Sequence, residues 1–202
     1  VSTALGRAIA SISNHNIPTD VLNRIVFETE KIHHGTPSGI DNTVIVYEQA
    51  IKFIKHRPIE ALTIRKPFSL IVADTGIPAP THESVGDVRA LYEADQQRIQ
   101  GIFDVIGTIV HSAIDCIARG DIPQLGALMT QNHECLQELT VSSKELDALV
   151  HVALDQGALG AKLSGGGRGG NMIALVQNDM IEHITQHLIE AGATRVFSTL
   201  VK

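Results

Sequence analysis

The chain has 202 residues, of which 44% are apolar and 19% are charged, and its formal net charge is −6. This length suits one large domain or two small ones, and the apolar fraction is enough to build a core, which excludes a disordered chain. No apolar run approaches the ~20 residues that span a bilayer, and the start lacks the pattern of a secretory signal, so we expect a cytoplasmic protein without membrane contact. The acidic balance argues against nucleic-acid binding.

Two helices are expected at the start of the chain. Residues 4–12 and 19–34 have helical patterns, and the turn residues of NHNIPT separate them. Gly35 and Pro37 are expected to end the second helix, because a left-handed cap followed by proline cannot continue it. Residues 42–65 are rich in β-branched side chains, which are typical of strands.

A buried-type strand and three consecutive helices are predicted next. The apolar run FSLIVADT, residues 68–75, has the length and composition of a strand inside a sheet. Apolar residues then recur at intervals of three and four over 97–119, where the pattern ends at a glycine, and again over 125–139. The third helix is expected to open at Ser142, with Glu145 three residues later completing a capping box.

The last third of the chain reads as a mixture of strands and a helix. AKLSGGGRGGNMIALV, residues 161–176, predicts a strand, a glycine loop and a second strand, and a helix at 179–190 and a strand at 195–201 follow. Because helices and strands do not alternate strictly, the predicted fold class is α+β. The two cysteines, Cys116 and Cys135, fall in helical patterns and are expected to be buried, reduced thiols.

The segment ETEKIHHGTPSGIDN, residues 28–42, is the first candidate for a functional site. Its turn places two glycines, a proline and small hydroxyl residues between the carboxylates of Glu30 and Asp41. Gly35 and Gly39 permit backbone conformations that other residues resist, so the backbone of such a turn can approach a ligand closely. A plain connector with a solvated acid at each end explains the composition equally well.

The second candidate is a run of five glycines and one arginine. Consecutive glycines can turn several backbone N–H groups toward one anion, and arginine adds a charge suited to phosphate. The run satisfies G-x-G-x-x-G, but NMIALV behind it reads as a strand rather than the helix that a dinucleotide site requires. A flexible hairpin turn would not need so many glycines, so we predict an anion site formed by Gly165, Gly166, Gly167, Arg168, Gly169 and Gly170.

Histidines suggest a third kind of site, which we do not favour. His183 and His187 are four residues apart and could share a metal ion on one helix face. No third ligand lies nearby in the sequence, and both residues fall opposite the apolar stripe of their helix. A solvated helix face is therefore the preferred interpretation.

Two segments, HGTPSGIDN at 34–42 and KLSGGGRGGNMIAL at 162–175, resemble two signatures of the GHMP family of small-molecule kinases. The sequence of the first segment is most similar to the same segment in the members that phosphorylate mevalonate. ADTGIPAPT at 73–81 resembles a third stretch of those members. This resemblance covers the whole chain. It implies the remnant of an N-terminal domain over 1–82, followed by a ferredoxin-like C-terminal domain over 83–202.

The resemblance also implies a reaction and a role for each candidate residue. The reaction is ATP- and Mg²⁺-dependent phosphorylation of mevalonate to 5-phosphomevalonate, and a homodimer is a further expectation. Asp41 matches the aspartate that acts on the substrate hydroxyl, and Glu30 matches the carboxylate that holds magnesium. The glycine run would contact the phosphates, and Thr75 would border the site. These parts are the ones that phosphoryl transfer requires.

Two departures from the family pattern bear on activity. Arg168 stands where the family has a glycine, and Asn171 stands where a small residue is frequent. The chain also begins with VSTALGRAIA, which resembles the helix after the family's main phosphate loop, P-x-x-x-G-L-G-S-S-A, and that loop is not in the sequence. We therefore expect the C-terminal part of a kinase, with little activity alone and with an apolar sheet edge prone to self-association.

Three other functions stay open on the sequence alone. A GHMP kinase for a different small alcohol would carry the same motifs. A binding module that keeps the fold without the chemistry would also carry them, although the presence of both Glu30 and Asp41 argues against an old loss of activity. A nicotinamide-dependent oxidoreductase is a distant third, because the glycine run lacks its helix.

Overall fold

The computed structural model describes residues 1–34, 38–55, 57–78 and 81–202. The chain divides into two compact units, Val1–Thr63 and Ile64–Lys202, and each has its own hydrophobic core. The strand at residues 68–74 belongs to the second unit, so the boundary between the units in the sequence comes before residue 82. The match between these units and the two domains of the kinase family stays a prediction.

The first unit consists, in its described residues, of three helices and a short hairpin. Its elements are α1 (Ser2–Ile12), α2 (Thr19–His34), α3 (Ile40–Tyr47), β1 (Ile51–Lys52) and β2 (Glu60–Ala61). The two predicted helices at the start are confirmed. Arg7 joins α1 to the end of α3, because its Nη2 donates to the carbonyl of Val46 at 3.0 Å and its Nη1 contacts Glu48.

The prediction of strand-type structure from residue 42 onward is wrong for the residues of α3. Thr43 Oγ1 donates to the carbonyl of Gly39 at 2.6 Å, and the amides of Asn42 and Asn23 are hydrogen-bonded at 2.7 Å. Both Asn42 and Thr43 are buried, so these contacts with α2 and the helix start override the preference of β-branched residues. The predicted helix stop at Gly35 and Pro37 lies outside the described residues.

The first unit exposes many large apolar side chains for its small core. The core cluster contains only Leu22, Val26 and Val46 as buried residues. Exposed apolar side chains lie on all three helices, and the expected apolar surface is therefore on helices rather than on a sheet edge in the described residues. The residues are Leu5, Ile9, Ile12, Ile25, Ile32, Ile40, Val44 and Ile45.

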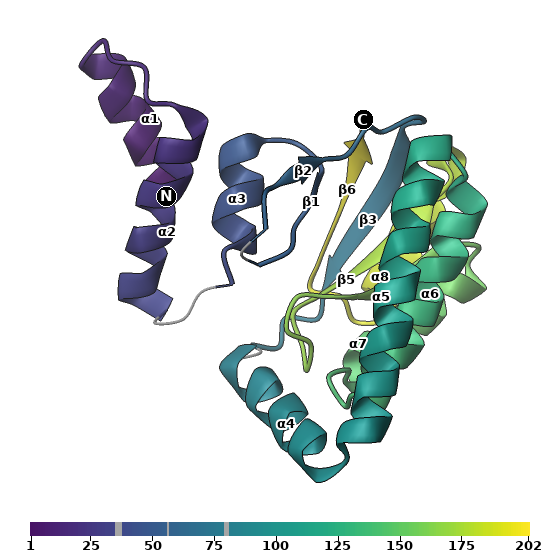
Figure 1. Ribbon diagram of the computed structural model, residues 1–202. Helices are drawn as coiled ribbons and strands as arrows, with labels where there is room; N and C mark the ends of the chain where they lie inside the picture. The colour runs from purple at the N-terminus through teal and green to yellow at the C-terminus, as the bar shows by residue number, and fades with distance from the viewer. Residues whose placement is uncertain (35–37, 56, 79–80) are drawn as a thin grey trace. The chain divides into compact units, whose positions relative to one another are not determined.

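A four-stranded antiparallel sheet organises the second unit. Its strands are β3 (Phe68–Asp74), β4 (Gly160–Ser164), β5 (Asn171–Val176) and β6 (Arg195–Val201), in the order β4-β5-β3-β6. All three pairs are antiparallel. With helices between β3 and β4 and between β5 and β6, this is the strand order of a split β-α-β, ferredoxin-like fold. The predicted α+β class and each of these four strands are confirmed (Figure 1).

Most helix ends in the second unit lie close to the ends that the sequence pattern predicts. They are α4 (Thr81–Ala94), α5 (Gln96–Arg119), α6 (Ile122–Glu138), α7 (Lys144–Asp155) and α8 (Ile181–Glu190). The sequence analysis missed α4. It also placed the cap of α7 one residue early, because Ser143 accepts from the Leu146 N–H while the hydroxyl of Ser142 is bonded to Asp147.

Helix α5 is long and apolar, with a mean hydropathy of 1.5. By length and composition alone it could cross a membrane, whereas the sequence analysis expected no such segment. This is weak evidence, because core helices give similar values. Ile99, Ile102 and Ile109 of α5 pack into the core of the second unit. Cys116 and Cys135 are buried and form no disulfide, as expected.

Helix α6 covers the free edge of strand β4. Thr130 Oγ1 accepts from the Ala161 N–H at 3.4 Å, and His133 Nδ1 accepts from the Leu163 N–H at 3.3 Å. These side chains take the place of a neighbouring strand, which closes an edge that would otherwise pair with another chain. The close approach requires glycine, because a Cβ atom at Gly160 would overlap the carbonyl of Gly126.

Candidate active site

The glycine run forms the loop between β4 and β5. Its conformation needs glycine at most positions, because φ is +92° at Gly165, +77° at Gly167, +143° at Gly169 and +68° at Gly170. Arg168 also has a positive φ, of +61°. The predicted order of strand, loop and strand is confirmed, so the run is not the strand–loop–helix of a dinucleotide site.

Backbone carbonyls on two sides hold this loop. Val141 O accepts from the Arg168 N–H at 2.8 Å, and Ile77 O accepts from the Gly170 N–H at 3.0 Å. A Cβ atom at Gly167 would overlap Val141 O, and one at Gly169 would lie 2.5 Å from Ile77 O. The loop is therefore packed tightly against its supports and is not a freely flexible turn.

Thr75 ties the end of β3 to the glycine loop. Its N–H and its Oγ1 both donate to the carbonyl of Gly170, at 2.9 and 3.0 Å, and its side chain is buried. The neighbouring carboxylate of Asp74 accepts from the Gly76 N–H at 2.8 Å. The sequence analysis placed Thr75 at the border of the site, and the structure places it directly against the predicted phosphate loop.

A hollow of about 420 Å³ lies on the open side of the loop. The N–H groups of Gly165, Gly166, Gly167 and Gly169 donate to no described residue. All four glycines line the hollow, so these amides lie beside it. Its lining consists of Asp74, Gly76, Ile77, Pro78, Ser164, Asn171 and the loop glycines.

The sequence analysis did not single out Asp74, which lines this hollow. The sequence could have pointed to Asp74, because it stands directly before Thr75 in the ADTGIPAPT stretch. Its carboxylate accepts from the Gly76 N–H and keeps a negative charge beside the hollow.

Arg168 does not line the hollow. Its guanidinium pairs with the carboxylate of Asp87 on α4. The positive charge that the sequence suggested for phosphate is thus offset by an acid, and the pair fastens α4 to the loop. A direct contact between Arg168 and phosphate stays a prediction.

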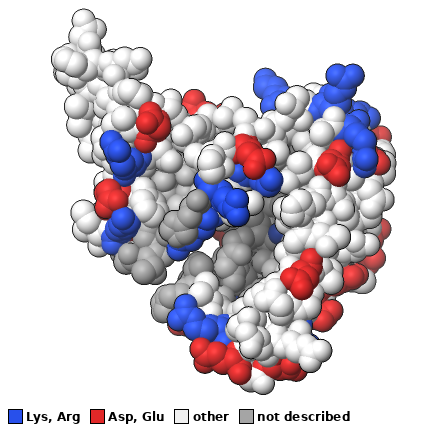
Figure 2. Space-filling model, in the orientation of Figure 1, with Lys and Arg blue, Asp and Glu red and all other residues white. Residues whose placement is uncertain are grey.

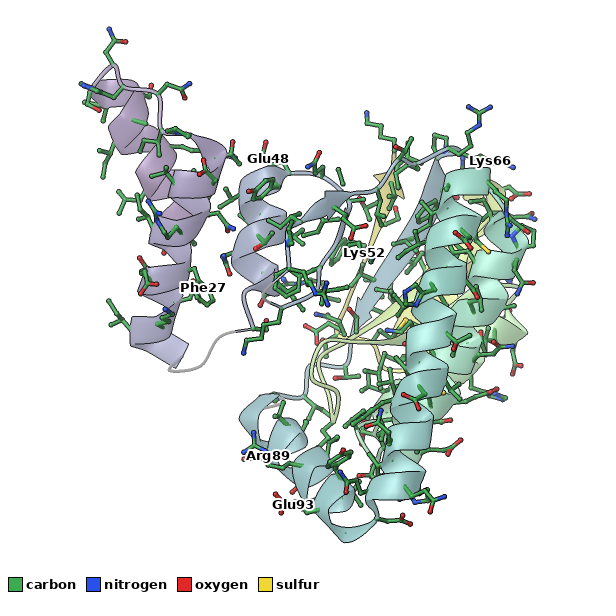
Figure 3. All side chains as sticks on the ribbon, viewed as in Figure 1. Phe27, Glu48, Lys52, Lys66, Arg89 and Glu93 are labelled. Atoms are coloured by element: carbon green, nitrogen blue, oxygen red, sulfur yellow. The ribbon has the colours of Figure 1, made fainter. Side chains whose placement is uncertain are left out.

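The two acidic residues lie in the first unit. Glu30 is half-buried on α2, and Asp41 is exposed in the first turn of α3. Gly39, the N-cap of α3, has φ of +88° and lies under the rings of Phe27 and Phe53, where a Cβ atom would be 3.3 and 3.5 Å away (Figure 3 labels Phe27). The turn thus uses Gly39 as predicted, whereas Gly35 lies outside the described residues.

The described residues contain no cluster of metal ligands. Among them, no group of three or more histidine, cysteine or acidic side chains could hold a metal by itself. Mg²⁺ usually needs only one or two carboxylates together with phosphate oxygens and water. The role of Glu30 as a magnesium ligand stays a prediction.

Charged side chains of both signs lie on the face that Figure 2 shows, with Asp and Glu most evident along its lower edge. Burial lowers the pKa of Lys162, whose Nζ donates to the carbonyl of Leu163 at 2.7 Å. On α8, His183 is exposed, as the solvated-face interpretation predicts, and His187 is half-buried.

Comparison with known proteins agrees with this fold. Residues 113–193 match the sequence family described as GHMP kinases C terminal. The mevalonate kinase of L. major, solved in complex with R-mevalonate, superposes with a TM-score of 0.95 and 31% identity, over 100% of this chain and 64% of that chain. In this stretch, and in the fold as a whole, the chain is therefore similar to GHMP kinases.

Among these kinases, the chain corresponds to the C-terminal portion of mevalonate kinases. It is 35% identical to the mevalonate kinase of Pyrococcus furiosus, over 97% of this chain and 60% of that protein. The chain thus spans about three fifths of the length of this relative. Phosphomevalonate kinase of Streptococcus pneumoniae, solved with phosphomevalonate and AMPPNP, shares the fold with a TM-score of 0.76 at 15% identity.

Proposed function

We propose that the complete gene product containing these residues transfers the γ-phosphoryl group of ATP to the primary hydroxyl of mevalonate. The observation that supports this best is the glycine loop, which is held by Val141 and Ile77 and has, beside a hollow, four N–H groups that donate to no described residue. Such a preorganised set of donors suits phosphate groups. The similarity to mevalonate kinases supports mevalonate as the alcohol.

Each acidic residue has one task in this proposal. Asp41 orients the substrate hydroxyl and accepts its proton, which an exposed carboxylate at neutral pH can do. Glu30 is the protein ligand of Mg²⁺. When bound, ATP supplies the phosphoryl group and Mg²⁺ offsets the charge that gathers on the phosphates. Thr75 holds the loop through Gly170 and is a positioning residue.

A substrate panel tests the proposal. The complete gene product, with ATP and Mg²⁺, is expected to phosphorylate mevalonate at least about 100-fold more efficiently than phosphomevalonate, galactose or homoserine, since these differ in groups that a polar pocket must pair. A preference for another alcohol would instead support a different GHMP kinase. A complete gene product that consumes ATP with none of these alcohols would contradict a kinase of this family.

The 202-residue chain by itself is expected to show little or no turnover. It contains no P-x-x-x-G-L-G-S-S-A loop, and phosphoryl transfer depends on charges and donors gathered around the γ-phosphate. The measurement is ATP-dependent phosphorylation of mevalonate by the purified chain, beside an intact relative such as that of Pyrococcus furiosus. Turnover equal to that of the relative would show that the loop is dispensable.

A further inference from the structure

The segment between α6 and α7, residues 139–143, is the main support of the glycine loop. Its Val141 O accepts from the Arg168 N–H and leaves no room for a side chain at Gly167. A shift of Val141 would therefore displace the loop, because the two backbones are in direct contact.

Asp147, on α7, holds this supporting segment. Its Oδ1 accepts from the hydroxyl of Ser142, the residue after Val141. His133 Nε2 lies 3.1 Å from the same oxygen, outside hydrogen-bond geometry. Because Nδ1 of His133 accepts a hydrogen bond, the neutral ring carries its proton on Nε2, so a polar N–H group lies beside the carboxylate. His133 is only 4% exposed.

The same imidazole also contacts the strand that leads into the loop. His133 Nδ1 accepts from the Leu163 N–H at 3.3 Å, two residues before the loop begins at Gly165. His133 thus touches both the strand at the start of the loop and the carboxylate that holds the loop's support.

This trio is not a nucleophilic triad. The hydroxyl of Ser142 and the imidazole of His133 are both directed at Asp147, and the serine is not bonded to the histidine. A nucleophilic serine requires a base on its hydroxyl, which this geometry does not provide. The arrangement suits support rather than chemistry.

We propose that His133 is a positioning residue that, together with Asp147, holds the glycine loop in the shape that receives the phosphates of ATP. This role rests on the proposed function for its effect on catalysis. The effect on the loop itself can be measured without turnover.

The role requires a neutral imidazole, since Nδ1 must accept from Leu163. Burial lowers the pKa of His133, and the carboxylate of Asp147 opposes this; Lys162 on β4 lowers the pKa and Glu134 on α6 raises it. The unfolded chain then takes up the proton first, so stability falls as the pH drops below about 6.5, the ordinary imidazole value. Because kcat/KM follows the protonation of the folded enzyme, whose His133 pKa is lowered, we expect kcat/KM for ATP to begin to fall only at a pH below that value.

Three variants of the complete gene product test the proposal. His133→Asn keeps an acceptor near Nδ1 and removes Nε2, and Asp147→Asn removes the charge that holds Ser142. Thr130→Val is the matched control, because it removes an acceptor from the same helix and strand edge but does not touch the support. Amide hydrogen exchange of the loop, thermal midpoint, and kcat and KM between pH 5.5 and 8.5 are measured.

The two test variants are expected to speed exchange of the Arg168 amide by about 10-fold, while Thr130→Val leaves it within about twofold. They should also raise KM for ATP by about 10-fold, leave KM for mevalonate within about twofold, and weaken the acid limb. The proposal is overturned if all three variants lower the thermal midpoint alike without changing exchange at Arg168. A wild-type protein without mevalonate turnover would refute the proposed function, and the exchange data would still decide the role of His133.

Discussion

Replacing Asp41 by asparagine is expected to lower kcat of the complete gene product by about 10²- to 10⁴-fold, the usual contribution of a general base. KM for mevalonate should change little, because asparagine keeps the size and most of the hydrogen bonding of the carboxylate. Asp41 is exposed in the first turn of α3, and its carboxylate forms no ion pair or hydrogen bond with another described residue. The loss should therefore be catalytic, with a thermal midpoint close to that of the wild type.

Asp20→Asn provides the control for that experiment. Asp20 is also an exposed acid in the first turn of a helix of the first unit, so its replacement removes the same favourable interaction with a helix N-terminus. We expect Asp20→Asn to retain full turnover. If Asp41→Asn were as active as Asp20→Asn, the assignment of Asp41 would be wrong.

Gly167→Ala is expected to cause the largest loss of stability among loop substitutions. The added Cβ atom would overlap Val141 O at a residue whose φ is +77°. Overpacking usually costs about 1–3 kcal/mol, and a left-handed alanine adds about 1–2 kcal/mol. We therefore expect a decrease of about 2–5 kcal/mol in the free energy of unfolding, measured by urea denaturation, together with weaker ATP binding.

Gly165→Ala separates crowding from strain. Gly165 has φ of +92°, but a Cβ atom there would meet open space. The alanine variant should lose only the conformational part, about 1–2 kcal/mol. Equal losses for Gly165→Ala and Gly167→Ala would mean that contact with Val141 does not hold the loop.

Local signals predicted most of the second unit. The strand 68–74, the loop 165–170 and the helix that ends at Gly120 were predictable because each depends on a short pattern of apolar residues and glycines. Helix α3 was not, because its β-branched residues are overruled by buried hydrogen bonds from Asn42 and Thr43, and no local pattern reveals such contacts.

The candidate site was predictable in its residue types but not in its supports. The glycine run indicates a tight loop, yet its neighbours come from distant positions, with Val141 and Ile77 on two sides and Asp87 paired to Arg168. The sequence suggested that Arg168 binds phosphate, and it could not reveal that Asp87 pairs with Arg168. His133 also escaped notice, because a lone histidine on a helix is an ordinary core residue until the structure shows what it touches.

The contacts that hold the loop are made by main-chain atoms of Val141 and Ile77, and this determines which mutations the region tolerates. Every amino acid carries the same carbonyl, so exchanging either side chain for another of similar bulk leaves the loop's anchor in place. Adding or deleting one residue between α6 and α7 would move that carbonyl out of reach. Indels there should damage the protein far more than point changes do.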